Sequence, residues 1–209
     1  MNNSNQTQII YEYNVKFEIG RVLLGYFIPV ITLFGVILNP INFYVYSKKT
    51  FEKTSASYYL KLLSIVDTIT VVQSFNFFLP YSVFIDLKLL STFSCKFLFY
   101  TIYNSCALSA WIETSISLDR CLSISLLGSN RILDKHVIKY SVTAVLIVYN
   151  LAYYAPLLYY FDTIDGQYCT STDSTYLTVI SWMDLLNSSI VPFLTMLCCS
   201  IISVRFLVS

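Results

Sequence analysis

The chain has 209 residues, of which 56% are hydrophobic and only 12% are charged, and its formal net charge is +1. A soluble domain carries about 25% charged residues, so this sequence has too few polar side chains to coat one. The near-zero charge excludes a protein that binds nucleic acid through its phosphates. The composition predicts a protein of the lipid bilayer.

Residues 1–21 are polar and lack the basic start and apolar core of a cleavable signal peptide. Two glycosylation sequons, at Asn2 and Asn5, lie in this segment. Two sequons in a short polar tail before a hydrophobic stretch indicate an extracellular terminus. We therefore expect residues 1–21 to form an extracellular N-terminal tail and residues 22–209 to form the membrane domain.

Five hydrophobic stretches follow, each long enough to cross the roughly 30 Å hydrocarbon core as a helix of about 20 residues. They are predicted at residues 22–46, 59–84, 96–126, 137–159 and 177–204. All five prolines fall in these stretches, which membrane helices tolerate because neighbouring groups satisfy the freed carbonyls. The predicted fold is all-α, a polytopic transmembrane helix bundle.

Basic residues are distributed unevenly about these spans. An outside N-terminus places nine of the thirteen Lys and Arg residues on the cytoplasmic side, as the positive-inside rule requires. The segment between the fourth and fifth spans contains Asp162, Asp165 and Asp173 and no basic residue. The sequence therefore predicts a multi-pass membrane protein with an extracellular N-terminus.

The third predicted span carries a polar stripe. At about 100° per residue, its members fall within an arc of about 80°; they are Cys106, Ser109, Glu113, Ser117 and Arg120. Serines alone indicate helix–helix contact, whereas a carboxylate and a guanidinium at bilayer depth cost at least a few kcal/mol each and mark function. We expect this span to be the central and most enclosed helix.

Catalytic and metal-binding patterns are lacking in the sequence. The one histidine, His136, lies in a predicted loop without a second ligand, so neither a zinc site nor a nucleophile–base pair is expected. Intramembrane hydrolysis through Asp67 and Glu113 is the remaining enzymatic alternative. Of the six cysteines, Cys95 and Cys169 lie at the borders of hydrophobic segments and are the disulfide candidates.

Five short motifs occur in order along the chain. They are Asn39 in the first span, Leu63-Ser64-Ile65-Val66-Asp67 in the second, Cys95 placed twenty-five residues before Arg120 of Asp119-Arg120-Cys121 in the third, Cys169 in the following outer segment, and Pro192 in the fifth. Together they resemble the rhodopsin-like family of G-protein-coupled receptors. The resemblance covers essentially the whole chain but only five of the family's seven helices, so we expect a fragment of a longer receptor.

The resemblance implies roles for these residues. Cys95 and Cys169 would form the disulfide between the third helix and the second outer loop. In the Asp119-Arg120-Cys121 motif, Asp119 would pair with Arg120 and restrain the inactive state until Arg120 is released toward a heterotrimeric G protein.

Two further sites follow from the same resemblance. A sodium and water pocket would involve Asn39, Asp67 and Ser109, with Glu113 as a second carboxylate. The ligand cavity would be lined by Ile102, Tyr103, Cys106, Asp184 and Ser188.

The departures from the family pattern narrow the ligand class. Ile102 stands where amine receptors carry an aspartate, which argues against a biogenic amine. The stretch from Ser47 to Leu60 resembles invertebrate orphan peptide receptors. An acidic outer segment together with Asp184 suits a basic or amidated peptide.

The sequence thus predicts a plasma-membrane receptor that senses an extracellular ligand, with a peptide favoured, and signals to a heterotrimeric G protein. No cofactor is expected beyond an allosteric Na⁺ at Asp67 and Ser109. Two alternatives stay open: a truncated, non-signalling partner of full-length receptors, and a transporter or channel with Asp67 and Glu113 in its ion path. Internal repeats, which favour transport, are not found in the sequence.

Overall fold

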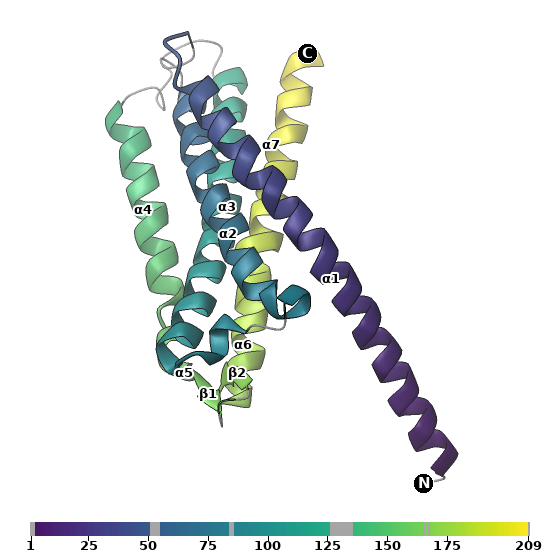
Figure 1. Ribbon diagram of the computed structural model, residues 1–209. Helices are drawn as coiled ribbons and strands as arrows, with labels where there is room; N and C mark the ends of the chain where they lie inside the picture. The colour runs from purple at the N-terminus through teal and green to yellow at the C-terminus, as the bar shows by residue number, and fades with distance from the viewer. Residues whose placement is uncertain are drawn as a thin grey trace.

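The structure, a computed structural model, describes residues 3–50, 55–83, 86–125, 136–164, 166 and 168–208. These residues form a helical bundle with one small hairpin (Figure 1). The longer helices are α1 (Asn3–Tyr46), α2 (Ser55–Val83), α3 (Thr92–Ser125), α4 (His136–Tyr154), α6 (Ser174–Asp184) and α7 (Val191–Val208). The shorter elements are the 3-10 turn η1 (Leu87–Leu89), helix α5 (Leu157–Tyr160), strands β1 (Phe161–Ile164) and β2 (Tyr168–Ser171), and the π-helical turn η3 (Leu185–Ile190).

Four helical segments are long and apolar enough to cross a membrane. They are Glu18–Tyr46, Ala56–Pro80, Val137–Tyr160 and Ser174–Phe206. Helix α3 is not among them, because polar residues interrupt its apolar sequence. The helical bundle expected from the sequence is therefore confirmed.

The bundle is apolar outside and partly polar inside. Large side chains such as Phe34, Val145 and Phe193 are 60%, 66% and 61% exposed, while Asn150 and Asn187 are buried. Water-soluble proteins show the opposite distribution, and exposed apolar surface of this extent marks contact with another apolar phase. Burial and hydropathy together indicate a membrane protein.

Helix α1 begins at Asn3, so the segment expected as a separate tail of residues 1–21 is helical where it is described. The polar residues there continue the helix without a proline, and Arg21 pairs with Glu18 one turn earlier at 2.7 Å. The N-terminal half of α1 extends away from the bundle, toward the same end as the hairpin (Figure 1). Its C-terminal half packs along α2.

The packing of α1 on α2 depends on a glycine. A Cβ placed on Gly35 would lie 2.9 Å from both methyl carbons of Val71 in α2, closer than real contacts allow. A second link is made near the helix ends, where the Ser57 hydroxyl donates to the carbonyl of Tyr46 at 2.8 Å. At position 35, only a residue without a side chain permits α1 and α2 to approach this closely.

Helix α3 is the centre of the bundle, since it contacts α2, α4, α5, α7 and β1. Its contact with α2 includes a core cluster of Tyr59, Val66 and Ile112. The polar stripe, however, is not enclosed as expected: Cys106, Glu113 and Arg120 are exposed among the described residues. The remaining faces of α3 are those that the neighbouring helices cover.

Prolines set two boundaries in the second half of the chain. The predicted fourth span of residues 137–159 is interrupted, because α4 ends at Tyr154 and α5 resumes after Pro156. In the fifth segment, Pro192 has no N–H to donate to the preceding turn, and the π-helical turn η3 directly precedes it. Asp173 begins this segment as the N-cap of α6.

The end of the bundle that carries β1 and β2 is called the hairpin end. The strands pair antiparallel with Thr163 opposite Cys169, and Gly166 has the positive φ of 64° that the connecting turn requires. The core here consists of Cys95, Ala107, Tyr154, Leu157, Phe161 and Ile180.

Candidate functional site

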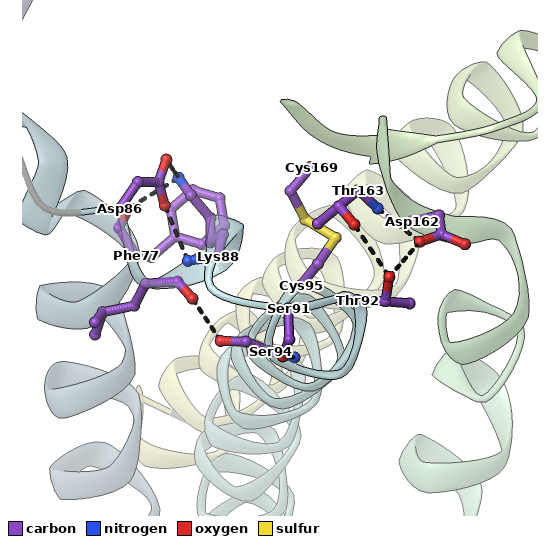
Figure 2. Close-up of a disulfide and its surroundings, with 11 residues drawn as sticks. Phe77, Asp86, Lys88, Ser91, Thr92, Ser94, Cys95, Asp162, Thr163 and Cys169 are labelled. Atoms are coloured by element: carbon purple, nitrogen blue, oxygen red, sulfur yellow. Dashed lines mark hydrogen bonds and ion pairs between the residues drawn. A yellow bond between two sulfur atoms is a disulfide. The ribbon is translucent and has the colours of Figure 1, made fainter. Parts of the chain in front are cut away.

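Cys95 and Cys169 meet at the hairpin end. Cys95, in the first turn of α3, is fully buried, and its sulfur is joined to that of Cys169 on β2, with 5.7 Å between the Cα atoms (Figure 2). The bond connects positions 74 residues apart. It fixes the hairpin over the start of α3, beside the helices that carry the proposed ligand residues.

Hydrogen bonds reinforce the same junction. The Thr92 hydroxyl donates to Asp162 at 2.9 Å and lies 3.0 Å from the hydroxyl of Thr163, so α3 and β1 are linked beside the disulfide (Figure 2). The bond from Thr92 lowers the pKa of the Asp162 carboxyl; the backbone N–H of Thr163 and nearby Lys96 act in the same direction. Asp162 is therefore held in its charged form.

On the side of α3 that faces α2, Lys88 of η1 contacts Phe77 of α2. Lys88 lies 4.3 Å from the centre of the Phe77 ring, donates to the Phe77 carbonyl at 3.2 Å and pairs with Asp86 at 3.7 Å (Figure 2). The Phe77 ring in turn packs edge-on against Phe99 of α3 at 5.0 Å. The hairpin end is thus tied to both α2 and α3.

Asp67 and Ser109 form the one direct contact within the proposed sodium pocket. The Ser109 hydroxyl of α3 donates to Asp67 of α2 at 2.5 Å. Asn39 lies instead in a groove of about 300 Å³ between α1 and α2, with Phe43 and Ile65. Glu113 is on the same α3 face as Ser109 but exposed.

Two oxygen-bearing side chains do not make a cation cage by themselves. The residues that the structure describes contain no group of three acidic, histidine or cysteine side chains able to hold a metal ion. Coordination of Na⁺ by Asp67 and Ser109 stays a prediction.

Asp119 and Arg120 lie near the opposite end of α3. Asp119 is buried at 7% exposure, whereas the Arg120 side chain is exposed. Adjacent helical positions point about 100° apart, so the two side chains leave α3 in different directions, and the pairing that the resemblance implies stays a prediction. Cys121 is buried and contacts Cys199 of α7.

The proposed ligand residues lie on α3 and on the α6–η3 segment. Asp184, the last residue of α6, is half-buried and accepts a hydrogen bond from Tyr154 of α4 at 2.8 Å. Tyr103 reaches the same region through ring contact with Tyr154 at 5.8 Å. Ser188 follows one turn after Asp184, and its hydroxyl donates to the Asp184 carbonyl at 2.8 Å.

The two other proposed ligand residues differ in burial. Cys106 is exposed on the polar stripe of α3, and Ile102, one turn earlier, is half-buried. Asp184 is tied into a side-chain hydrogen-bond network through Tyr154.

That network is centred on a residue that the sequence did not single out. Asn187, in the π-helical turn, is only 4% exposed. Its Oδ1 accepts from the indole N–H of Trp111 at 3.1 Å and from the Tyr149 hydroxyl at 3.0 Å, and its Nδ2 donates to Tyr154 at 3.2 Å. An asparagine three residues after an intramembrane aspartate was the available signal.

The predicted glycosylation sites carry no structural description. Asn2 lies outside the described residues, and Asn5 lies in a stretch of α1 whose side chains are not described. No protein-family model matches the chain, and no curated protein is detectably similar to it.

Proposed function

We propose that the protein is a G-protein-coupled receptor of the rhodopsin-like type. In this proposal α3 is a fifth membrane span, the five spans correspond to the first five of seven helices, and the hairpin end and the N-terminus face outward from the plasma membrane. The observation that carries the proposal is the Cys95–Cys169 link between the start of a central helix and the hairpin before the last segment.

The arrangement at the hairpin end supports a ligand site below it. The disulfide and the Thr92–Asp162 bond hold the hairpin over the outer ends of α3 and α4. Asp184 lies deeper, at the start of a π-helical turn, and π turns are frequent at functional sites. An extracellular ligand that reaches Asp184 contacts α3, α4 and the fifth segment together.

The signalling end lies on the same helix. Cys106 and Arg120 share one face of α3 and are separated by about 21 Å along its axis. Arg120 is exposed there, so its guanidinium is available to a cytoplasmic partner. Ligand binding that shifts η3 and α7 against α3 would change the surface around Arg120, which is how we propose that the signal reaches a G protein.

The test is G-protein activation in cells that express the product of the complete transcript. Resonance-energy-transfer sensors for each G-protein class report activation, first without ligand and then with fractionated peptide extracts. We expect a signal above that of mock-transfected cells, and its loss in Arg120→Ala. Arg205→Ala, which removes an exposed arginine of α7, is the matched control. Absence of activation with every sensor and extract, at normal surface expression, would contradict the proposal.

A second candidate function is favoured by the exposed stripe of α3. Glu113 and Arg120 at bilayer depth are costly unless another surface covers them. A non-signalling membrane partner that pairs with full-length receptors would use this face. Retention of a receptor inside the cell on co-expression, relieved by Glu113→Leu, would support this function over autonomous signalling.

A further inference from the structure

Among the residues that the structure describes, the half-buried Asp184 carboxylate has no cationic partner. Among the described side chains, the ion pairs are Arg21 with Glu18 and Lys88 with Asp86, and neither is at Asp184. Tyr154 donates to one of its oxygens. A hydrogen bond from a phenol offsets only part of the cost of a carboxylate at bilayer depth, which is why such groups normally face a charged partner.

The hydrogen bonds around Asn187 determine which atom donates and which accepts at each step from Trp111 to Asp184. The Trp111 indole can only donate, so the atom that faces it must be the oxygen of the Asn187 amide. The amide nitrogen then faces Tyr154 and donates to it. Since the Tyr154 oxygen accepts this bond, its own proton is directed to Asp184. Asp184 is thereby held as a hydrogen-bond acceptor towards Tyr154.

The surroundings suit a positive charge. The Tyr154 hydroxyl that donates to Asp184 belongs to a cluster of aromatic side chains, because the Tyr154 ring lies 5.8 Å from the ring of Tyr103 and 5.1 Å from that of Tyr153. The hairpin end contributes Asp162 on β1 and Asp173 at the start of α6, while residues 161–175 contain no Lys or Arg. Acidic groups at the entrance attract cations toward the site.

We propose that Asp184 binds a cationic group of the ligand, an ammonium or a guanidinium, and that Tyr154 and Asn187 are positioning residues for it. The inference rests on the proposed function in that it uses the same ligand site. It does not require G-protein coupling, so the two can fail separately.

The probe is argininamide, with citrullinamide as its neutral isostere. Each is titrated to millimolar concentration onto the purified full chain in lipid nanodiscs, and binding is followed by saturation-transfer NMR. We expect argininamide to bind and citrullinamide to bind at least about tenfold more weakly, because only the first carries a charge. Equal binding of the two, or no binding of argininamide, would overturn the proposal.

Variants assign the effect to the residues named. Asp184→Asn should weaken argininamide binding at least about tenfold and leave citrullinamide unchanged, while Asp184→Glu, which keeps the charge, should retain most of it. Tyr154→Phe and Asn187→Leu should each weaken binding severalfold through loss of position, not of charge.

Glu18→Gln, which removes an exposed carboxylate of α1, is the matched control and should bind as the unaltered chain does. If Asp184→Asn does not fold, Asp184→Glu and Tyr154→Phe decide: argininamide affinity unchanged in Tyr154→Phe contradicts the positioning role. Cation binding without any G-protein activation would sustain this inference and reject the proposed function.

Discussion

Helix α1 and the hairpin end differ in how they satisfy the hydrogen-bonding groups of their backbones. In α1 no residue of the most apolar window is buried, and among the described elements the helix packs closely only along α2. The hairpin end has a disulfide, paired strands, a helix N-cap and aromatic contacts. A helix satisfies its own backbone and can be surrounded by lipid, whereas strands and turns depend on tertiary partners. Exposed side chains therefore indicate contact with lipid in α1 and contact with water at the hairpin end.

The largest expected effect comes from breaking the hairpin end. Cys95→Ala should lower the free energy of unfolding by about 2–5 kcal/mol, because the cross-link closes a long loop and its removal leaves a buried gap. Unfolding of the purified chain in detergent, with and without reductant, measures this. Cys198→Ala, at an exposed free cysteine, should change nothing; equal stability of the two variants contradicts a structural role for the bond.

An aspartate introduced at two similarly exposed positions distinguishes a lipid-facing residue from a water-facing one. Phe34 in α1 and Tyr168 in β2 are 60% and 66% exposed. Phe34→Asp should cost about 3 kcal/mol in membrane insertion, because aspartate is unfavourable at the centre of a span. Tyr168→Asp should cost less than about 0.5 kcal/mol, as surface substitutions do. Glycosylation-tag insertion assays measure both, and a similar cost at the two positions would remove the distinction drawn between the regions.

The α1–α2 contact should be sensitive to a single side chain. Gly35→Val would drive a side chain into Val71 and should destabilise the packing by about 1–3 kcal/mol. Gly20→Val is the control, because nothing lies within 4 Å of its Cβ position. Proteolysis of α1 in nanodiscs reports its detachment. Equal cleavage of the two variants would show that α1 does not dock closely on α2.

The smallest expected effect is a pH dependence at the hairpin end. The hydrogen bond from Thr92 lowers the pKa of Asp162 in the folded state below its value of about 3.9 in the unfolded chain. The stabilisation is therefore complete above about pH 4 and is lost as the pH falls through the lower, folded-state value. Melting temperature measured between pH 7 and pH 3 should fall less in Asp162→Asn than in the unaltered chain; parallel curves would contradict the assignment.

The helices were predictable because a bilayer demands long apolar segments, and the 59–84 and 96–126 predictions differ from α2 and α3 by a few residues at most. The Asp67–Ser109 contact joins two residues that the sequence had placed in one pocket. The helical start at Asn3 was not predicted, because the polar residues there indicate a tail outside the membrane domain. The break at Pro156 was not predicted, because membrane helices tolerate proline.

The Asn187 network was not predictable for a different reason. Face assignments used 100° per residue, and the π-helical turn changes that angle between Asp184 and Pro192. The hairpin was also missed, because two four-residue strands give too short a pattern. Partners that depend on tertiary packing, such as Trp111 and Tyr149 on other helices, leave no trace in local sequence.

The measurement that tests the central claim most directly is the reading frame of the transcript across the codon for Ser209. The receptor account predicts that the frame continues into two more apolar spans, with the tryptophan–proline and Asn-Pro motifs of the rhodopsin-like family. Their helices would then cover the exposed face of α3 that carries Glu113 and Arg120. A stop codon at this point would contradict autonomous G-protein signalling and favour a membrane partner of other receptors.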